Sequence, residues 1–117
     1  MSTVVGGTTA KGTTFWSRRT AVYEFLMEDV AAGLHDPKLV TRLRESVDAN
    51  GLDLDDLSLV DLAQLLTAAN DVAESYRSKT AEQKSSEPDY AYLNQAASEL
   101  AVLVSAVLDW RRSRDDR

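Results

Sequence analysis

The feature that most constrains the fold of this chain is an apolar run at residues 100–108, in which Ser105 is the one polar residue. As a helix, the run would be apolar on nearly all sides. Such a helix is usually buried against several neighbours or against a partner molecule. Glu99 and Asp109 bound the run, which is much shorter than the roughly 20 residues of a membrane span. We therefore expect either the central helix of a domain or a seam between subunits.

The composition is that of a soluble globular protein. The 117 residues are enough for one domain, and a hydrophobic share of 44% argues against a disordered chain. Cysteine is absent, which excludes disulfides, thiolate metal sites and cysteine nucleophiles and agrees with a reducing compartment. The N-terminus has neither the basic nor the apolar region of a signal peptide. These features predict a cytoplasmic protein without membrane association.

The charge is acidic overall and basic toward the ends. The sequence has 13 Lys and Arg against 19 Asp and Glu, a formal net charge of −6 at pH 7. Lys11, Arg18 and Arg19 precede the first acidic residue, Glu24, and further arginines follow Asp109. Because the acidic body would repel polyanions, nucleic acid is not an expected partner. An acidic surface suits a basic protein instead, since complementary charge accelerates their encounter.

Apolar residues recur at helical spacing in four segments, and no segment alternates with the period of a strand over more than a few residues. The expected helices cover residues 17–32, 37–50, 58–78 and 87–112. Residues 1–14 are rich in glycine and threonine and lack periodicity, so we expect a flexible N-terminal arm there. The predicted fold is all-α: a four-helix antiparallel bundle over residues 15–117, preceded by this arm.

Short capping signals mark the expected helix boundaries. Gly33 should end the first helix in the left-handed conformation, and Asp36 with Pro37 should start the second. Ser58, followed three residues later by an acid, has the spacing of a capping box for the third helix. The fourth helix should start near residues 86–89 and be the longest of the four.

Residues that could support catalysis or bind a metal are few. His35 is the only histidine, and beside the expected cap at Asp36 it should be an exposed loop residue. The Glu-x-x-His motif of bundle metal sites is absent. A calcium loop counted from Asp53 would need glycine and glutamate where Ser58 and Gln64 stand. With no phosphate-binding or nucleophile motif either, the sequence predicts a non-enzymatic protein without metal or cofactor.

Six residues are candidates for contact with a partner protein. The three acids precede the third expected helix, where they could equally oppose the positive end of its dipole. The two tyrosines should point to opposite faces of the fourth helix, so one of them must be exposed. The tryptophan lies two residues after the end of the apolar run, in a position either to plug the core or to anchor an interface. The six are Asp53, Asp55, Asp56, Tyr90, Tyr92 and Trp110.

The leading hypothesis is that this small acidic helical protein binds another protein, in an inhibitor, immunity, antitoxin-like or adaptor role. One alternative is a homo-oligomeric structural or assembly protein that dimerises through residues 100–110 of the last helix. A further alternative is a small regulatory module that binds DNA or a ligand. For DNA binding, the helix with Lys38, Arg42 and Arg44 is the candidate.

Overall fold

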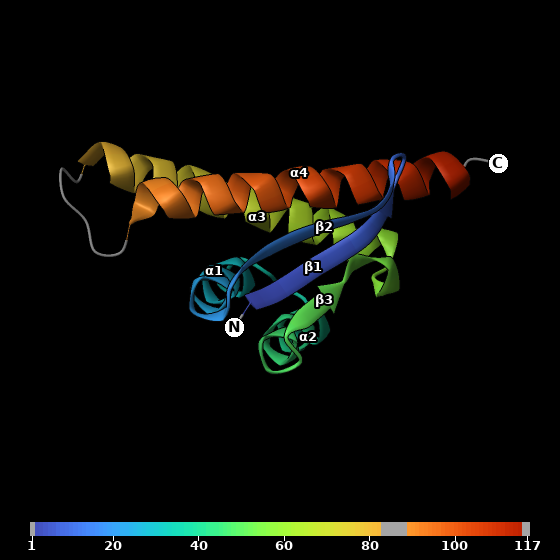
Figure 1. Ribbon diagram of the computed structural model, residues 1–117, viewed down its shortest axis with the longest axis horizontal. Helices are drawn as coiled ribbons and strands as arrows, with labels where there is room; N and C mark the ends of the chain where they lie inside the picture. The colour runs from blue at the N-terminus through green and yellow to red at the C-terminus, as the bar shows by residue number, and fades with distance from the viewer. Residues whose placement is uncertain (1, 83–88, 116–117) are drawn as a thin grey trace.

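The structure, a computed structural model, describes residues 2–82 and 89–115 of the chain. In this part of the chain, three strands and four α-helices form an α+β fold (Figure 1), so the predicted all-α four-helix bundle is wrong. The elements are, in chain order, β1 (Ser2–Thr9), β2 (Gly12–Arg19), α1 (Thr20–Ala32), α2 (Pro37–Asp48), β3 (Gly51–Asp53), the 3-10 helix η1 (Leu54–Asp56), α3 (Leu59–Glu82) and α4 (Tyr90–Asp115).

The N-terminal segment, expected to be a flexible arm, instead forms the central strand of the sheet. β1 pairs antiparallel with β2 along its whole length, from Ser2 opposite Arg19 to Thr9 opposite Gly12. Gly12 has a φ of +97° in the connecting turn, a conformation that glycine adopts without steric cost. Threonine and valine, which favour strands, make up most of β1. The expectation of a flexible arm at residues 1–14 is therefore wrong.

Because most residues of β1 are small, its sequence lacks the alternating hydrophobic pattern from which a strand is predicted. The buried face of β1 consists of Thr3, Val5, Gly7 and Thr9, while Val4 on the other face is 38% exposed. Because valine is the one strongly apolar residue on the buried face, hydrophobicity does not alternate along the strand with a period of two. This face is buried because its small side chains let α4 and η1 pack close to the strand.

A third strand, three residues long, joins the hairpin to the middle of the chain. β3 runs parallel to β1, with Val4 opposite Gly51 and Gly6 opposite Asp53, so the strand order is β2-β1-β3. Asn50 has a left-handed φ of 58° in the short connection from α2 to β3. The sheet is therefore mixed, and its two outer strands differ in length.

The two long helices, α3 and α4, lie side by side, and the sheet packs on α4 (Figure 1). Within residues 100–108 of α4, all but Val102, Ser105 and Ala106 are buried in the chain itself. The apolar run is therefore mainly core. By length and composition α4 could cross a membrane, and half of its most apolar stretch is buried within the fold.

Two of the predicted helix caps are confirmed. The side chain of Asp36 accepts a hydrogen bond from Lys38 N at 2.9 Å. Ser58 Oγ accepts one from Asp61 N at 3.1 Å, at the start of α3. Each bond satisfies one of the backbone donors that a helix leaves unpaired at its N-terminus.

Other helix boundaries differ from expectation. α1 begins at Thr20 rather than at residue 17, because residues 17–19 belong to β2. Gly33 has a right-handed φ of −91°, so the expected left-handed conformation is wrong. α2 ends two residues earlier than expected, whereas α3 and α4 extend further. Residues 86–88, where the fourth helix was expected to start, lie outside the described residues, and Asp89 accepts a bond from Tyr92 N at 3.1 Å.

The burial of α4 predicts opposite outcomes for two neighbouring valines. Val104→Asp should destabilise the fold by about 4 kcal/mol or more, because it places an unpaired charge at a site with no solvent exposure. Val102→Asp, at a residue that is 70% exposed, should cost about 0.5 kcal/mol or less. Urea unfolding followed by circular dichroism measures both. Similar losses in the two variants would contradict the placement of α4.

Two glycines provide a second test of packing. A Cβ at Gly7 would lie 2.6 Å from Val107 Cγ2 and 3.1 Å from Leu54 Cβ. Gly7→Ala should therefore destabilise the protein by about 1–3 kcal/mol through overpacking. At Gly33 the nearest atom to such a Cβ is 3.6 Å away, so Gly33→Ala should be neutral or stabilising by about 0.4–1 kcal/mol. Thermal unfolding distinguishes the two, and a stable Gly7→Ala variant would refute the contact with Val107.

Candidate functional site

The outer strand β2 presents a free edge. β1 pairs with it on one side, and no strand of the described part of the chain pairs with it on the other. Residues 12–17 of this strand contain neither proline nor a charged side chain, the usual devices that prevent further strand pairing. The opposite edge, β3, is only three residues long and contacts α2. The long free edge of the sheet is thus on the β2 side.

A groove of about 690 Å³ runs between β2 and α4. Thr14, Phe15 and Trp16 line it from the strand, and Val102, Ala106 and Trp110 are among the α4 residues that line it. Residues 9–11 at the hairpin tip close the end nearest the C-terminal half of α4 (Figure 1). Its size lies within the range of ligand-binding clefts, and most of its lining residues named here are apolar.

Two apolar side chains in the groove wall are largely exposed. Phe15 on β2 is 67% exposed and Val102 on α4 is 70% exposed. The Phe15 ring lies beside Gly6, on the face of β2 opposite to Trp16, whereas Val102 lines the groove from α4. Exposed apolar side chains at the rim of a groove commonly mark an interaction site. Val60, at the start of α3, is similarly exposed at 65% but does not line the groove. It therefore offers a matched control for substitutions in the groove.

Both tryptophans of the chain line the groove. Trp16 is 6% exposed, and its ring lies 6.2 Å from that of Tyr23. Its buried indole N–H has no hydrogen-bond acceptor among the described residues. Such unpaired buried donors are uncommon in native proteins. Trp110 is half-buried, and the guanidinium of Arg114 lies 5.6 Å from its ring.

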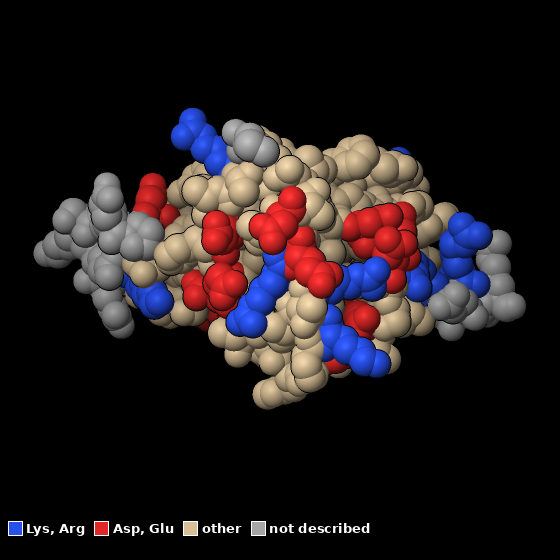
Figure 2. Space-filling model, turned by 90° about the horizontal axis from the view of Figure 1, so that it is seen from below, with Lys and Arg blue, Asp and Glu red and all other residues tan. Residues whose placement is uncertain are grey.

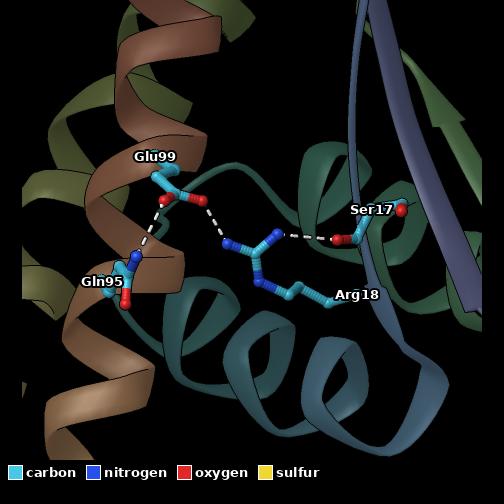
Figure 3. A network of polar contacts seen from close by, with 4 residues as sticks. All are labelled: Ser17, Arg18, Gln95 and Glu99. Carbon is cyan, nitrogen blue, oxygen red and sulfur yellow. Dashed lines mark hydrogen bonds and ion pairs between the residues drawn. The ribbon is translucent and has the colours of Figure 1, made fainter.

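Arg18 connects β2 to α4 at the other end of the groove (Figure 3). Its guanidinium forms an ion pair with Glu99 and donates a hydrogen bond of 2.7 Å to Ser17 O. Gln95 Nε2 donates to the second carboxylate oxygen of Glu99 at 3.2 Å. The guanidinium also lies 5.2 Å from the Trp16 ring, within cation–π range. This network fixes the distance between the strand and the helix.

Two carboxylates border the groove, one toward each end. Glu99 lies at the Arg18 end and is partly neutralised by that ion pair. Asp109 lines the groove with Lys11 near the hairpin tip, and none of the ion pairs found among the described residues includes it. The groove is therefore apolar along its length, with one carboxylate and one basic side chain at each end: Glu99 with Arg18, and Asp109 with Lys11.

The three candidate acids lie together in the turn before α3. Asp55 accepts hydrogen bonds from Thr8 N at 2.9 Å and from Thr8 Oγ at 2.7 Å. Asp53 accepts one from Asp55 N at 3.0 Å, and Asp56 O accepts one from Arg42 at 3.4 Å. Asp55 thus fastens the turn to β1, a structural role that the sequence did not indicate.

The three aromatic candidates are spread along α4. Tyr92, 41% exposed, is the exposed member of the tyrosine pair, and Arg18 lies 5.9 Å from its ring. Tyr90 is half-buried, with its ring 5.7 Å from that of Tyr76. Of the six candidates, Trp110 alone lines the groove. The groove residues Phe15, Trp16 and Val102 were not among the candidates.

Polar groups elsewhere have structural roles. Tyr76 OH donates to Asp29 at 2.6 Å, and burial together with this carboxylate raises the pKa of Tyr76. Burial also raises the pKa of Tyr23, which pairs with Ser46 at 2.5 Å. No group of three potential metal ligands occurs in residues 2–82 and 89–115.

On the face of the molecule seen from below (Figure 2), acidic and basic side chains are mixed. Figure 2 views the molecule from below, on the side of α2 and β3, and shows basic side chains interspersed among the acidic ones. One such contact on this side joins Arg44 to Glu28 at 3.6 Å. The described residues of this face therefore present no uniformly acidic surface to a partner (Figure 2).

Loss of the Arg18–Glu99 ion pair should lower the free energy of unfolding more than loss of the Arg77–Glu74 ion pair. Glu99→Gln should lower the free energy of unfolding by about 0.2–1 kcal/mol, because Arg18 loses its carboxylate partner. Glu74→Gln, which removes the partner of the more exposed Arg77, should have a smaller effect. The difference should shrink in about 1 M salt, where charges are screened within about 3 Å. Equal losses in chemical unfolding would refute the special role of the Arg18 pair.

Comparisons with known proteins identify no relative of this chain. No protein-family model, no curated protein sequence and no solved structure matches this chain. The functional assignment therefore depends on the free edge of β2 and the groove beside it.

Proposed function

We propose that the protein binds another protein by accepting an extended segment of the partner as an additional strand beside β2. The observation that supports this proposal is the free eight-residue edge that directly borders an apolar groove. In strand addition, backbone hydrogen bonds supply affinity and alternate side chains enter adjacent pockets. Here those side chains would contact Val102, Ala106 and Trp110.

The charge of the site indicates the kind of segment that fits. Glu99 and Asp109 border the groove, and the whole chain has a net charge of −6. A segment with apolar residues at alternate positions and a positive net charge would match the lining of the groove and the negative net charge of the chain. Inhibitor, immunity, antitoxin-like and adaptor roles all include the binding of a partner protein. We propose this binding step for the groove beside β2.

The polar groups at the groove support binding rather than catalysis. Arg18 and Glu99 are paired with each other, so neither is free to transfer a proton to a substrate. Most of the other side chains that line the groove are aromatic or aliphatic. Such side chains contribute to binding by burying apolar surface against the partner. We therefore propose a non-enzymatic role.

Selection from a displayed library of random peptides tests this function. Selected peptides should share alternating apolar residues and a positive charge. They should also change the tryptophan fluorescence, because both tryptophans line the groove. Val102→Glu should weaken binding at least tenfold, or about 1.4 kcal/mol, by placing a charge on the groove floor.

Val60→Glu is the matched control, since it introduces the same charge at an equally exposed valine outside the groove. Its peptide affinity should equal that of the unsubstituted protein. Circular dichroism would establish that both variants are folded. Failure to select any peptide, or equal binding by the two variants, would refute the proposed function.

A further inference from the structure

Asn50 stands in the connection from α2 to β3 and is followed directly by Gly51. It is exposed, and it is the one residue other than glycine with a positive φ, 58°, in residues 2–82 and 89–115. Asn50 and Gly51 do not line the groove beside β2. The chemistry of this pair is therefore independent of the proposed function.

An asparagine side chain can react with the backbone of the residue that follows it. The backbone nitrogen of that residue, deprotonated by hydroxide, attacks the side-chain amide carbon Cγ. A C–N bond forms, the bond from Cγ to the amide nitrogen breaks, and ammonia leaves with a proton from water, which regenerates hydroxide. Water then opens the resulting succinimide ring at either carbonyl, which gives aspartate or isoaspartate. In isoaspartate the main chain runs through the former side chain and is one carbon atom longer.

The backbone nitrogen of Gly51 is open to this reaction. Gly51 has no side chain that could obstruct the approach of its nitrogen to Asn50 Cγ. Val4 N donates to Asn50 O, and in a parallel ladder the next donor toward β1 is then Leu52 N. The Gly51 N–H therefore points away from β1, and no acceptor for it is found in the part of the chain that the structure describes.

The backbone around Asn50 is held weakly. Attack requires the peptide group between Asn50 and Gly51 to rotate until the nitrogen faces Cγ. Asn50 N donates to Val47 O, and Asn50 O accepts from Val4 N, and each of these bonds measures 3.3 Å. Both are longer than the range of about 2.7–3.2 Å that is usual for N–H···O bonds. Rotation of the peptide group therefore breaks only a long, weak hydrogen bond.

The other two asparagines of the sequence, Asn70 and Asn94, lie within helices. In an α-helix the N–H of the following residue is bonded to a carbonyl four residues earlier, so its nitrogen is held away from the side chain. Asn94 Nδ2 also donates to Ala73 O at 2.7 Å. Asn70 is exposed, as Asn50 is, and therefore provides an internal control that differs in backbone structure.

We propose that Asn50 is a site of spontaneous deamidation and that its isoaspartate product releases β3 from the sheet. β3 has only three residues, and its pairing with β1 begins with Gly51 opposite Val4. An additional backbone carbon directly before Gly51 displaces the strand from this register. Release of β3 opens the second edge of β1 and exposes Leu52, which is 7% exposed in the intact fold.

Peptide mapping by mass spectrometry tests the site after incubation of the full chain in mildly alkaline buffer. Asn50 should convert faster than Asn70 by about tenfold or more, a factor that corresponds to about 1.4 kcal/mol, because α3 must first open locally at Asn70. The rate should rise with pH, since hydroxide removes the proton from the Gly51 nitrogen. Equal rates at Asn50 and Asn70 in the folded chain would overturn the proposal.

Two variants identify the source of the products. Asn50→Gly should abolish the new acidic species in ion-exchange chromatography, because glycine accepts the left-handed φ and has no amide to lose. Asn70→Ala removes an equally exposed amide and should leave formation of that species unchanged. Accumulation of the acidic species in Asn50→Gly would also overturn the proposal.

The purified isoaspartate form tests the release of β3. Asn50→Asp is its matched control, since it has the same additional negative charge on a backbone of normal length. The isoaspartate form should unfold at a lower urea concentration than Asn50→Asp. Its Val4 amide should exchange hydrogen faster, because this amide donates to the residue 50 carbonyl in the intact fold. The same unfolding midpoint and the same Val4 exchange rate in both forms would refute the release of β3.

Discussion

The close packing of α4 on β1 at Gly7 is the constraint on which the rest of the structure depends. With no side chain at this position, Val107 and Leu54 can approach the strand from the helix and from η1. The hairpin can therefore lie directly on the core helix. Because β2 is paired with β1 along its whole length, its position beside α4 follows from that contact.

The groove exists because β2 and α4 are joined near their ends and separated between them. Gly7 and Val107 hold the hairpin to the C-terminal half of the helix, while Arg18 and Glu99 join strand and helix at the other end. The Arg18 side chain also packs on the Trp16 ring, so it braces the wall of the groove as well as its end. A single polar residue thus links β2 to α4 and contacts one of the aromatic side chains that line the groove.

The helices could be predicted from the sequence, whereas the sheet and the groove could not. Helical periodicity and local caps such as Asp36 are encoded within a few residues, so the positions of four helices followed from the sequence with small errors at their ends. β1 has mostly threonine and glycine on its buried face, and its pairing with β3 joins segments about 50 residues apart. The groove requires that hairpin, so its strand residues Phe15 and Trp16 were not among the predicted site residues. Trp110 was identified because it adjoins the apolar run.

The order of elements along the chain determines when the hairpin can be covered during synthesis. β1 and β2 leave the ribosome first, but β3 follows after two helices and α4 is made last. Until α4 emerges, the face of the hairpin that includes Val5 and Trp16 lacks the long helix that packs on it and has α1 beside it instead, through Tyr23. Both edges of the hairpin are open for part of that time. Until α4 has been made, a nascent chain therefore presents a strand pair exposed to intermolecular pairing. The first hairpin of this fold thus depends for its burial on the last of its helices.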